Sequence, residues 1–436
     1  MERLRSVVFS RNLAFSALRL LFLKYALDNY IGATNKEEMQ QCVRAQKMFA
    51  LRDVDNGIET IIPVLQYIDR AYGLENVLSN PANIEEYARE LFGVDRARQK
   101  RNTTETGFRS LIEFVGTLDL EDKENEPIIG KNLVDAMVGV IESNFERNSY
   151  SGEYVTNVSV SSLAKELLQV NEDDTFVDFA AGSGVSTLLI TGDTRPTIAN
   201  VEKNAVNAAA AAMLFIMYDY RKISIRVGDS ISTQIPDLRG NKLFVDPPIM
   251  GRVEKSDTNE YTDMTLAAMN RVMHDYLTRD GEAVVIVPSG TLFQGKKQAV
   301  GIREELVQLG MVKAVITLPP MWYASSVNTN LLLISKKEMP QSEVLFIDAT
   351  KEMKSAKGKS GPANSISAEL CKKIVTTISG RMEIEGFSCL VHQNKIREKD
   401  YNLVPATYLT VPAEEDNITM EEVNTQLADL YRQLME

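Results

Sequence analysis

Short apolar runs that each end in a small or acidic residue repeat along the chain between Thr175 and Pro248. Asp178, Glu202, Asp229 and Asp246 close four successive runs. Parallel strands present ligand contacts at their carboxyl ends, so this pattern predicts an α/β protein with a Rossmann-like sheet and four carboxylates along one edge. Any one of these acids is equally suited to a turn or a helix cap. Four in succession, followed by two prolines, favour a ligand site.

The first 148 residues show helical periodicity instead. Apolar residues between Leu18 and Tyr25 recur at intervals of three and four, and a further helix is expected over Leu133–Phe145. The sequence therefore predicts a separate all-helical domain over residues 1–149, followed by a sheet domain over residues 150–412.

The loop after the first apolar run contains Gly182 and Gly184, which let backbone amides approach a ligand without interference from a Cβ atom. A dinucleotide-binding fingerprint has a third glycine three residues later, where this chain has Thr187. An NAD site is therefore disfavoured. Glu202 follows the loop by roughly twenty residues, the spacing at which a carboxylate binds ribose hydroxyls.

The fourth run ends in the motif Asp246, Pro247, Pro248, Ile249. It resembles the Pro-Pro motif of S-adenosylmethionine-dependent methyltransferases that modify exocyclic amino groups, in which an aromatic residue follows the prolines. The lone pair of an aromatic amine is delocalised into its ring. If Asp246 and the carbonyl of Pro247 accept its hydrogen bonds, the lone pair localises for attack, and two prolines hold these acceptors rigidly. The alternative is a Pro-Pro pair that only ends a strand.

The net charge of the 436-residue chain is −12. Duplex DNA is bound mainly by Lys and Arg that neutralise phosphates, so any contact with DNA must be local or supplied by a partner. Three scattered cysteines and two histidines disfavour a disulfide framework and a zinc site. Arg19 and Lys24 interrupt the apolar run Leu13–Leu27, short of the ~20 residues that a membrane helix needs, and the run is not a cleavable signal. The sequence thus predicts a cytoplasmic protein without a metal.

The chain resembles the modification (M) subunits of type I restriction-modification systems, which are gamma-type DNA adenine methyltransferases. The resemblance begins at Leu18–Asp28 (LRLLFLKYALD), continues at Gly152–Thr156 (GEYVT) and ends at Lys395–Leu409 (KIREKDYNLVPATYL). The glycine loop, the Pro-Pro motif and further blocks follow in the family's order. A methyltransferase sheet ends in an antiparallel hairpin, which Val312–Leu318 and Leu331–Ser335 are expected to form.

The resemblance implies roles for individual residues. Asp246 and Pro247 would accept the hydrogen bonds of the target adenine's amino group, and Glu202 would bind the ribose of the cofactor, S-adenosylmethionine. The other residues implied in the cofactor site are Thr156, Gly182 and Gly184 at the methionine part, Asp229 and Ser230 at the adenine, and Asp178 and Ala180 beside the glycine loop.

The resemblance also implies partners. In the family, the carboxyl-terminal helices of M subunits pack on a specificity subunit, which recognises the DNA sequence. Apolar residues from Met420 to Leu434 recur at three and four, which predicts an amphipathic helix over residues 413–436 that either caps its own domain or binds a partner's groove. A hetero-oligomer with two M subunits is expected, and whether a restriction subunit is also present stays open.

Two departures from the family's pattern stand out. Asn157 occupies the place of a proline, and Ile249 the place of the aromatic residue that stacks on the base flipped out of the duplex. Tyr261, Trp322 and Tyr323 are candidates to stack instead, although each is also suited to filling a core or loop. One alternative function is therefore a cofactor-binding scaffold with weakened catalysis. Another is methylation of a glutamine side chain in a protein, which the helical domain and the downstream blocks disfavour.

Overall fold

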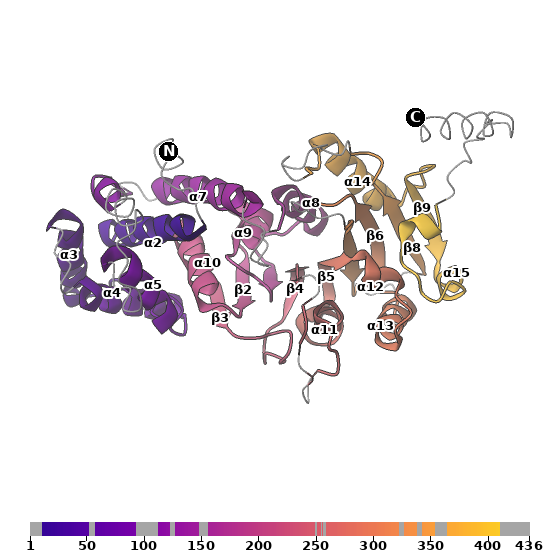
Figure 1. Ribbon diagram of the computed structural model, residues 1–436, viewed down its shortest axis with the longest axis horizontal. Helices are drawn as coiled ribbons and strands as arrows, with labels where there is room; N and C mark the ends of the chain where they lie inside the picture. Colours follow the sequence, from indigo (N-terminus) through magenta and orange to yellow (C-terminus); the bar gives the residue numbers. More distant parts are fainter. Residues whose placement is uncertain are drawn as a thin grey trace, which may run out of the picture.

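The structure, a computed structural model, describes residues 11–51, 57–92, 112–122, 127–147, 156–248, 251–253, 255, 259–321, 327–337, 342–353 and 364–409. It shows a helical segment beside a large mixed sheet (Figure 1). Ile249, Trp322, Tyr323 and the helix expected over residues 413–436 lie outside the described residues. Both predicted domain boundaries lie outside them as well, so the division into domains stays a prediction.

The amino-terminal part of the chain is helical, as its periodicity predicts. Its helices are α2 (Arg11–Asp28), α3 (Lys36–Leu51), α4 (Gly57–Tyr72), α5 (Pro81–Phe92) and α7 (Ile128–Arg147). Helix α3 begins where Asn35 caps it, because Oδ1 of Asn35 accepts hydrogen bonds of 3.0 Å from the N–H groups of Glu37 and Glu38.

In the described part of the chain, nine strands form one sheet in the order β3-β2-β1-β4-β5-β7-β6-β8-β9. They are β1 (Thr175–Asp178), β2 (Thr197–Glu202), β3 (Ile223–Val227), β4 (Gly240–Val245), β5 (Leu277–Pro288), β6 (Val312–Leu318), β7 (Thr329–Ser335), β8 (Glu343–Asp348) and β9 (Ser388–His392). Strands β1 to β5 are parallel, whereas β7 is antiparallel to both β5 and β6. The predicted Rossmann-like sheet and its terminal hairpin are confirmed, and β8 and β9 extend the sheet beyond the predicted elements.

Helices cover both faces of the sheet. Neighbouring residues of a strand point to opposite faces, so Phe176 joins one apolar core and Val177 the other. The first core contains residues of α8 (Val158–Leu168), α9 (Val185–Thr191), α10 (Ala205–Met217) and α14 (Ala368–Gly380). The second contains residues of α11 (Met264–Arg271), η3 (Val272–Tyr276), α12 (Ser289–Phe293), α13 (Lys297–Gln308) and α15 (Gln393–Arg397). The remaining short helices are η2 (Gly192–Thr194) and η4 (Pro405–Thr407).

Helix α10 joins the amino-terminal helices to the sheet. Asn204 caps its start, because Oδ1 of Asn204 accepts a hydrogen bond of 2.9 Å from the N–H of Val206. Every residue from Ala208 to Met217 is buried, as expected of a helix that is apolar on all sides. It contacts α2, α5 and α7 as well as β2 and β3. The amino-terminal helices therefore share one continuous apolar core with a face of the sheet.

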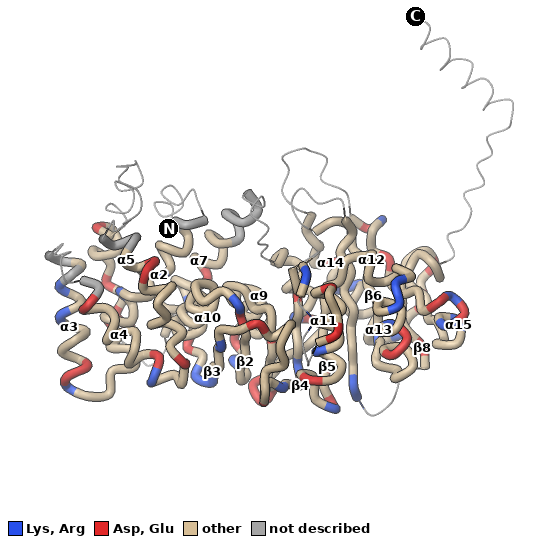
Figure 2. The backbone as a smooth tube through the Cα atoms, turned by 60° about the horizontal axis from the view of Figure 1, so that its bottom comes forward, with Lys and Arg blue, Asp and Glu red and all other residues tan. Residues whose placement is uncertain are grey.

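Glu282 on β5 is a buried acceptor for three lysines at the edge of the sheet where β4 and β6 begin. Its carboxylate oxygens lie 3.0 Å from Nζ of Lys242, 3.1 Å from Nζ of Lys313 and 3.2 Å from Nζ of Lys337. Burial raises the pKa of Glu282, but the hydrogen bonds and charges of the lysines outweigh burial and lower the pKa to about 2. Figure 2 shows Lys and Arg residues along this edge beside β4 and β5.

Within the described ranges, no helix is long and apolar enough to cross a membrane. The same residues contain no group of three His, Cys, Asp or Glu side chains that is suited to hold a metal ion.

Candidate active site

The carboxyl ends of the parallel strands bring the predicted acids to one edge of the sheet. Asp178 ends β1 and Glu202 ends β2, while Asp246 directly follows β4 and Asp229 lies just beyond β3. Because β1 lies between β2 and β4, Asp178 is the central carboxylate. Burial raises the pKa of Asp178 to about 7, and the negative charges of Asp246 and Glu202 contribute in the same direction.

Asp178 points into the protein and organises the glycine loop. Its Oδ1 accepts a hydrogen bond of 3.1 Å from the N–H of Ala180, and its Oδ2 accepts one of 3.1 Å from Oγ1 of Thr187. Thr187 is fully buried and also accepts a hydrogen bond of 3.2 Å from Nδ2 of Asn200. Thr187 thus uses its hydroxyl to anchor the loop at the place where a dinucleotide fingerprint has glycine. Asp178 and Ala180 shape the loop through these bonds.

Different structural features explain why glycine stands at the two positions of the loop. Both have positive φ, +54° at Gly182 and +78° at Gly184. A Cβ atom on Gly184, which caps α9, would lie 2.7 Å from Cβ of Ala211 on α10, so close packing requires glycine there. A Cβ atom on Gly182 would meet no atom within 4 Å. Open space beside Gly182 is what a ligand at this loop needs.

Glu202 is joined to this loop by its side chain. Oε2 accepts a hydrogen bond of 2.8 Å from the N–H of Gly182, and Oε1 accepts one of 2.7 Å from the N–H of Asn204. The side chain is half-buried, and burial raises the pKa of Glu202 although these hydrogen bonds lower it. Glu202 thus lies at the carboxyl end of β2, and the sequence spacing predicts that it binds the ribose of a ligand.

Asp229 and Ser230, predicted at the cofactor's adenine, differ in their contacts. Asp229 is half-buried and accepts hydrogen bonds of 2.9 Å from Oγ of Ser232 and from Nζ of Lys203. Burial raises the pKa of Asp229, but these bonds outweigh burial and lower it. The hydroxyl of Ser230 is buried and donates to the carbonyl oxygen of Phe179. Ser230 therefore ties the end of β3 to the end of β1.

Tyr276 supports the same loops and was not among the predicted site residues. Its hydroxyl donates a hydrogen bond of 2.8 Å to the carbonyl oxygen of Ser230, and its ring packs edge-on against Phe179 with 4.9 Å between the ring centroids. Tyr276 lies 46 residues from Ser230 along the chain, and no local pattern marks such a contact.

Asp246 lies beside Thr156, the last residue of the GEYVT motif. Oγ1 of Thr156 donates a hydrogen bond of 2.7 Å to Oδ2 of Asp246. Burial raises the pKa of Asp246 to about 6, and the hydrogen bond from Thr156 lowers it in part. Pro247 is buried, whereas Pro248 is exposed. The structure thus brings Thr156 to the Pro-Pro motif.

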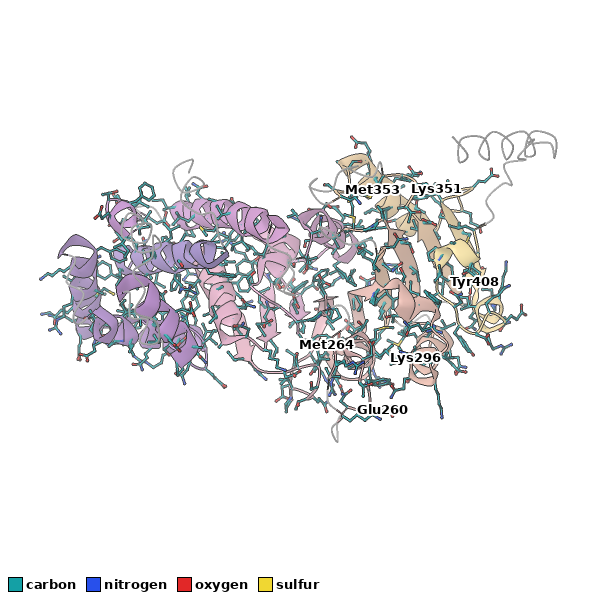
Figure 3. The ribbon with its side chains drawn as sticks, in the orientation of Figure 1. Glu260, Met264, Lys296, Lys351, Met353 and Tyr408 are labelled. Atoms are coloured by element: carbon teal, nitrogen blue, oxygen red, sulfur yellow. The ribbon has the colours of Figure 1, made fainter. Side chains whose placement is uncertain are left out.

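After the motif, residues 251–253 pair antiparallel with residues 262–264, and Glu260 contacts the start of α13. The carbonyl oxygens of Pro248 and Gly251 accept hydrogen bonds of 3.1 Å from the N–H groups of Gly251 and Met264. Nε2 of Gln298 donates one of 3.1 Å to the carbonyl oxygen of Glu260, and Figure 3 shows Glu260 and Met264 on this side of the sheet. Tyr261, which follows Glu260, is only 8% exposed and belongs to the apolar core. Tyr261 therefore fills the core, and a stacking role does not suit it.

Asn157 is a functional neighbour that sequence reasoning noted only as a departure. Its Oδ1 caps α8 by accepting a hydrogen bond of 3.0 Å from the N–H of Ser159. Its Nδ2 donates hydrogen bonds of 3.0 Å to the carbonyl oxygens of Met321 and Asn364. A proline could make none of these bonds. The capping pattern was available in the sequence, but carbonyl partners 164 and 207 residues away were not.

These features define a methyltransferase fold of the Rossmann-like class, with its glycine loop after β1, its Pro-Pro motif after β4 and its terminal hairpin. Residues 130–417 match the N-6 DNA Methylase family, and the chain belongs to this family.

Two curated relatives are named as methylase subunits of type I restriction enzymes, the family that the sequence resembles. The chain is 27% identical to the type I restriction enzyme MjaVIII methylase subunit of Methanocaldococcus jannaschii, over 76% of this chain and 65% of that protein. It is 23% identical to the type I restriction enzyme MpnII methylase subunit of Mycoplasma pneumoniae, over 74% of this chain and 64% of that protein. The chain thus covers slightly less than two thirds of either relative. The predicted resemblance is confirmed.

A solved structure has the same fold over nearly the whole chain. The type I restriction-modification system methyltransferase subunit from Streptococcus thermophilus aligns with a TM-score of 0.67 and 20% sequence identity, over 94% of this chain and 99% of that one. At this identity the likeness bears on the fold alone.

Proposed function

We propose that this chain transfers a methyl group from S-adenosylmethionine to the exocyclic amino group of adenine in DNA, as the modification subunit of a type I restriction-modification complex. The observation that carries the proposal is the position of Asp246 and the two prolines at the end of β4, next to the glycine loop that follows β1. Membership of the N-6 DNA Methylase family supports the choice of an adenine amino group.

The residues at the ends of β1, β2 and β3 suit S-adenosylmethionine. When bound, this cofactor supplies an electrophilic methyl group. The space beside Gly182 admits a ligand against the loop backbone, and we assign Glu202 to the ribose hydroxyls. We assign Asp229 to the adenine, and Ser230 to the support of that contact because its hydroxyl is bonded to Phe179.

Asp246 and Pro247 are assigned to the target amine. Above its pKa of about 6, Asp246 is ionised and accepts hydrogen bonds without donating any. One N–H of the amine donates to Asp246 and the other to the carbonyl of Pro247, which localises the nitrogen lone pair. Asp246 then receives the proton that the amine loses on methylation and releases it to solvent. Two consecutive prolines restrict the backbone that carries these acceptors.

A specificity subunit is assigned to the recognition of DNA sequence. The chain has a net charge of −12, and both acidic and basic residues are scattered along its described backbone (Figure 2). A partner that contributes phosphate contacts would compensate for this unfavourable charge.

Ile249 favours a second candidate, a cofactor-binding scaffold with weakened catalysis. An aromatic residue in that place would stack on the flipped base, and such stacking is worth about 1–3 kcal/mol per base. A scaffold would bind the cofactor and assemble with its partners without transferring methyl groups.

One experiment separates the two candidates. Labelled methyl incorporation into unmethylated and hemimethylated duplex DNA is measured with the specificity partner present, for the parent protein and for Asp246→Ala. We expect transfer by the parent and none by Asp246→Ala, with equal cofactor binding in both. Parent protein that binds the cofactor but transfers nothing would support the scaffold, and transfer by Asp246→Ala would disprove the assignment of Asp246.

A further inference from the structure

Thr156 and Asp246 meet although 90 residues separate them in the chain. Oγ1 of Thr156 donates a hydrogen bond of 2.7 Å to Oδ2 of Asp246, and Thr156 is only 8% exposed. In the part of the chain that the structure describes, Oδ1 of Asp246 has no hydrogen-bond partner. Among the described residues, Thr156 therefore holds one oxygen of the carboxylate, and the other oxygen has no partner.

We infer that Thr156 is a positioning residue for methyl transfer, which holds Oδ2 of Asp246 so that Oδ1 is presented to the target amine. This inference rests on the proposed function. It gives Thr156 a different role from the one that the sequence resemblance implies, which is contact with the methionine part of the cofactor.

The proton count of the hydroxyl supports the new role. A threonine hydroxyl has a single proton to donate, and in this structure the hydroxyl of Thr156 donates it in the hydrogen bond to Oδ2 of Asp246. While this bond is made, Thr156 has only lone pairs left, which can accept a hydrogen bond from the cofactor's ammonium group but cannot donate one to its carboxylate. A contact between Thr156 and the cofactor carboxylate would therefore require breaking the bond to Asp246.

The neighbours of both residues keep this contact in place. Asn157, which follows Thr156, is bonded to the carbonyl oxygens of Met321 and Asn364 at 3.0 Å. Asp246 directly follows β4 and precedes the buried Pro247. Thr156 is thus fixed by a segment that is anchored independently of the Pro-Pro motif.

The chemistry of aspartate explains why such a residue is needed. An asparagine amide has one acceptor oxygen and one donor nitrogen, whereas the two oxygens of a carboxylate are equivalent and either can be protonated. A donor on Oδ2 favours the ionised form of Asp246 and distinguishes its two oxygens. Without this donor, the carboxyl would stay protonated up to a higher pH, and the protonated form is a weaker acceptor.

Single-turnover methyl transfer by the full chain with its specificity partner, measured against pH, tests the inference. In the parent, the rate should rise with pH as Asp246 ionises, near its pKa of about 6. The neighbouring Asp178, whose pKa is raised to about 7 partly by the charges of Asp246 and Glu202, is present in the parent and in every variant of Thr156, so the comparison between them isolates the effect of Thr156. In Thr156→Val this rise should move upward by about 1–2 pH units, the shift expected when a charged group loses one hydrogen bond. The rate near pH 7 should then fall about twofold to tenfold, because that is the loss of the ionised fraction which such a shift causes. Thr156→Ser keeps the hydroxyl and should restore the parental profile.

Two further variants complete the test. Asp246→Asn does not titrate, so its rate should be lower and should not rise with pH in this range. Thr350→Val is the matched control, because Oγ1 of Thr350 donates a hydrogen bond of 2.6 Å to Oδ1 of Asp348. It removes the same kind of bond at β8, which strands β5, β7 and β6 separate from β4. Lys351, the neighbour of Thr350, lies well apart from Met264 in Figure 3. This control should leave the profile unchanged.

Cofactor affinity, measured by calorimetry on the same variants, provides the readout that does not depend on activity. We expect Thr156→Val to bind S-adenosylmethionine as the parent does. Weakened binding with an unmoved pH profile would overturn the inference and return Thr156 to the cofactor. An unmoved profile with unchanged binding would also overturn it, and leave the proposed function intact. Parent protein that binds the cofactor but transfers no methyl would overturn both.

Discussion

The N–H of Gly182 donates a hydrogen bond of 2.8 Å to Oε2 of Glu202, so the glycine loop orients the carboxylate at the end of the neighbouring strand. The N–H of Asn204, at the start of α10, orients the other oxygen. A ligand at this edge therefore meets a carboxylate whose direction is already set, which reduces the entropy lost on binding.

We expect Glu202→Ala to weaken the binding of S-adenosylmethionine by an order of magnitude or more. The substitution removes a charged acceptor for ribose hydroxyls, and each hydrogen bond to a charged group is worth about 1.5–3 kcal/mol. Calorimetry of the purified protein measures the affinity. Glu172→Ala, at an exposed position, is the matched control. Unchanged affinity in Glu202→Ala would show that Glu202 only anchors the loop.

Ile249→Phe is expected to raise single-turnover methyl transfer. A ring in this place would restore stacking on a flipped base, and about 1–3 kcal/mol of stacking corresponds to roughly tenfold to a hundredfold in rate if it falls wholly on the reacting complex. The measurement uses labelled methyl and duplex DNA, with cofactor affinity checked in parallel. A lower rate with preserved cofactor binding would mean that the pocket is shaped for another target, or that another aromatic side chain already stacks there.

Gly184→Ala should destabilise the fold more than Gly182→Ala. Both positions have positive φ, which is unfavourable for alanine, but only at Gly184 would the new Cβ lie within 2.7 Å of Ala211. The difference between the two losses of unfolding free energy, measured in urea, reports the cost of that contact, and about 1–3 kcal/mol is expected for an overpacked site. Equal losses would show that α9 and α10 move apart without cost.

Glu282→Gln should destabilise the protein at neutral pH and reduce the dependence of stability on pH in the acid range. The folded-state pKa of Glu282 is lowered from 4.5 to about 2, so its stabilising effect is present above the unfolded-state pKa. It is lost as the pH falls from about 4.5 towards about 2. A shift of this size corresponds to about 3 kcal/mol. Urea unfolding at several pH values measures it, and a variant with the parental pH dependence would contradict the assignment to Glu282.

Much of the fold follows from local patterns. The helical spacing from Leu18 to Tyr25 predicts α2, and apolar runs ending in Glu202 and Asp246 predict β2 and β4. These patterns are informative because the periodicity of a helix or strand is set by residues close together in the chain. How the amino-terminal helices pack illustrates the limit, while the division of the chain into domains stays a prediction. These helices share a core with the sheet through α10, and the pattern of one segment does not show which other segment covers it.

The sequence by itself determined the parallel sheet, the glycine loop, the strand-end carboxylates and the Pro-Pro motif, because each depends on residue type and short spacing. Only the tertiary structure decided how these parts act on one another. It brought Thr156 to Asp246 across 90 residues, and it turned the hydroxyl of Ser230 to Phe179 across 51 residues. A hydrogen bond of this kind depends on the direction of the donor side chain and on the position of its acceptor in three dimensions. Both are set by the packing of strands and helices that the chain brings together only when it folds.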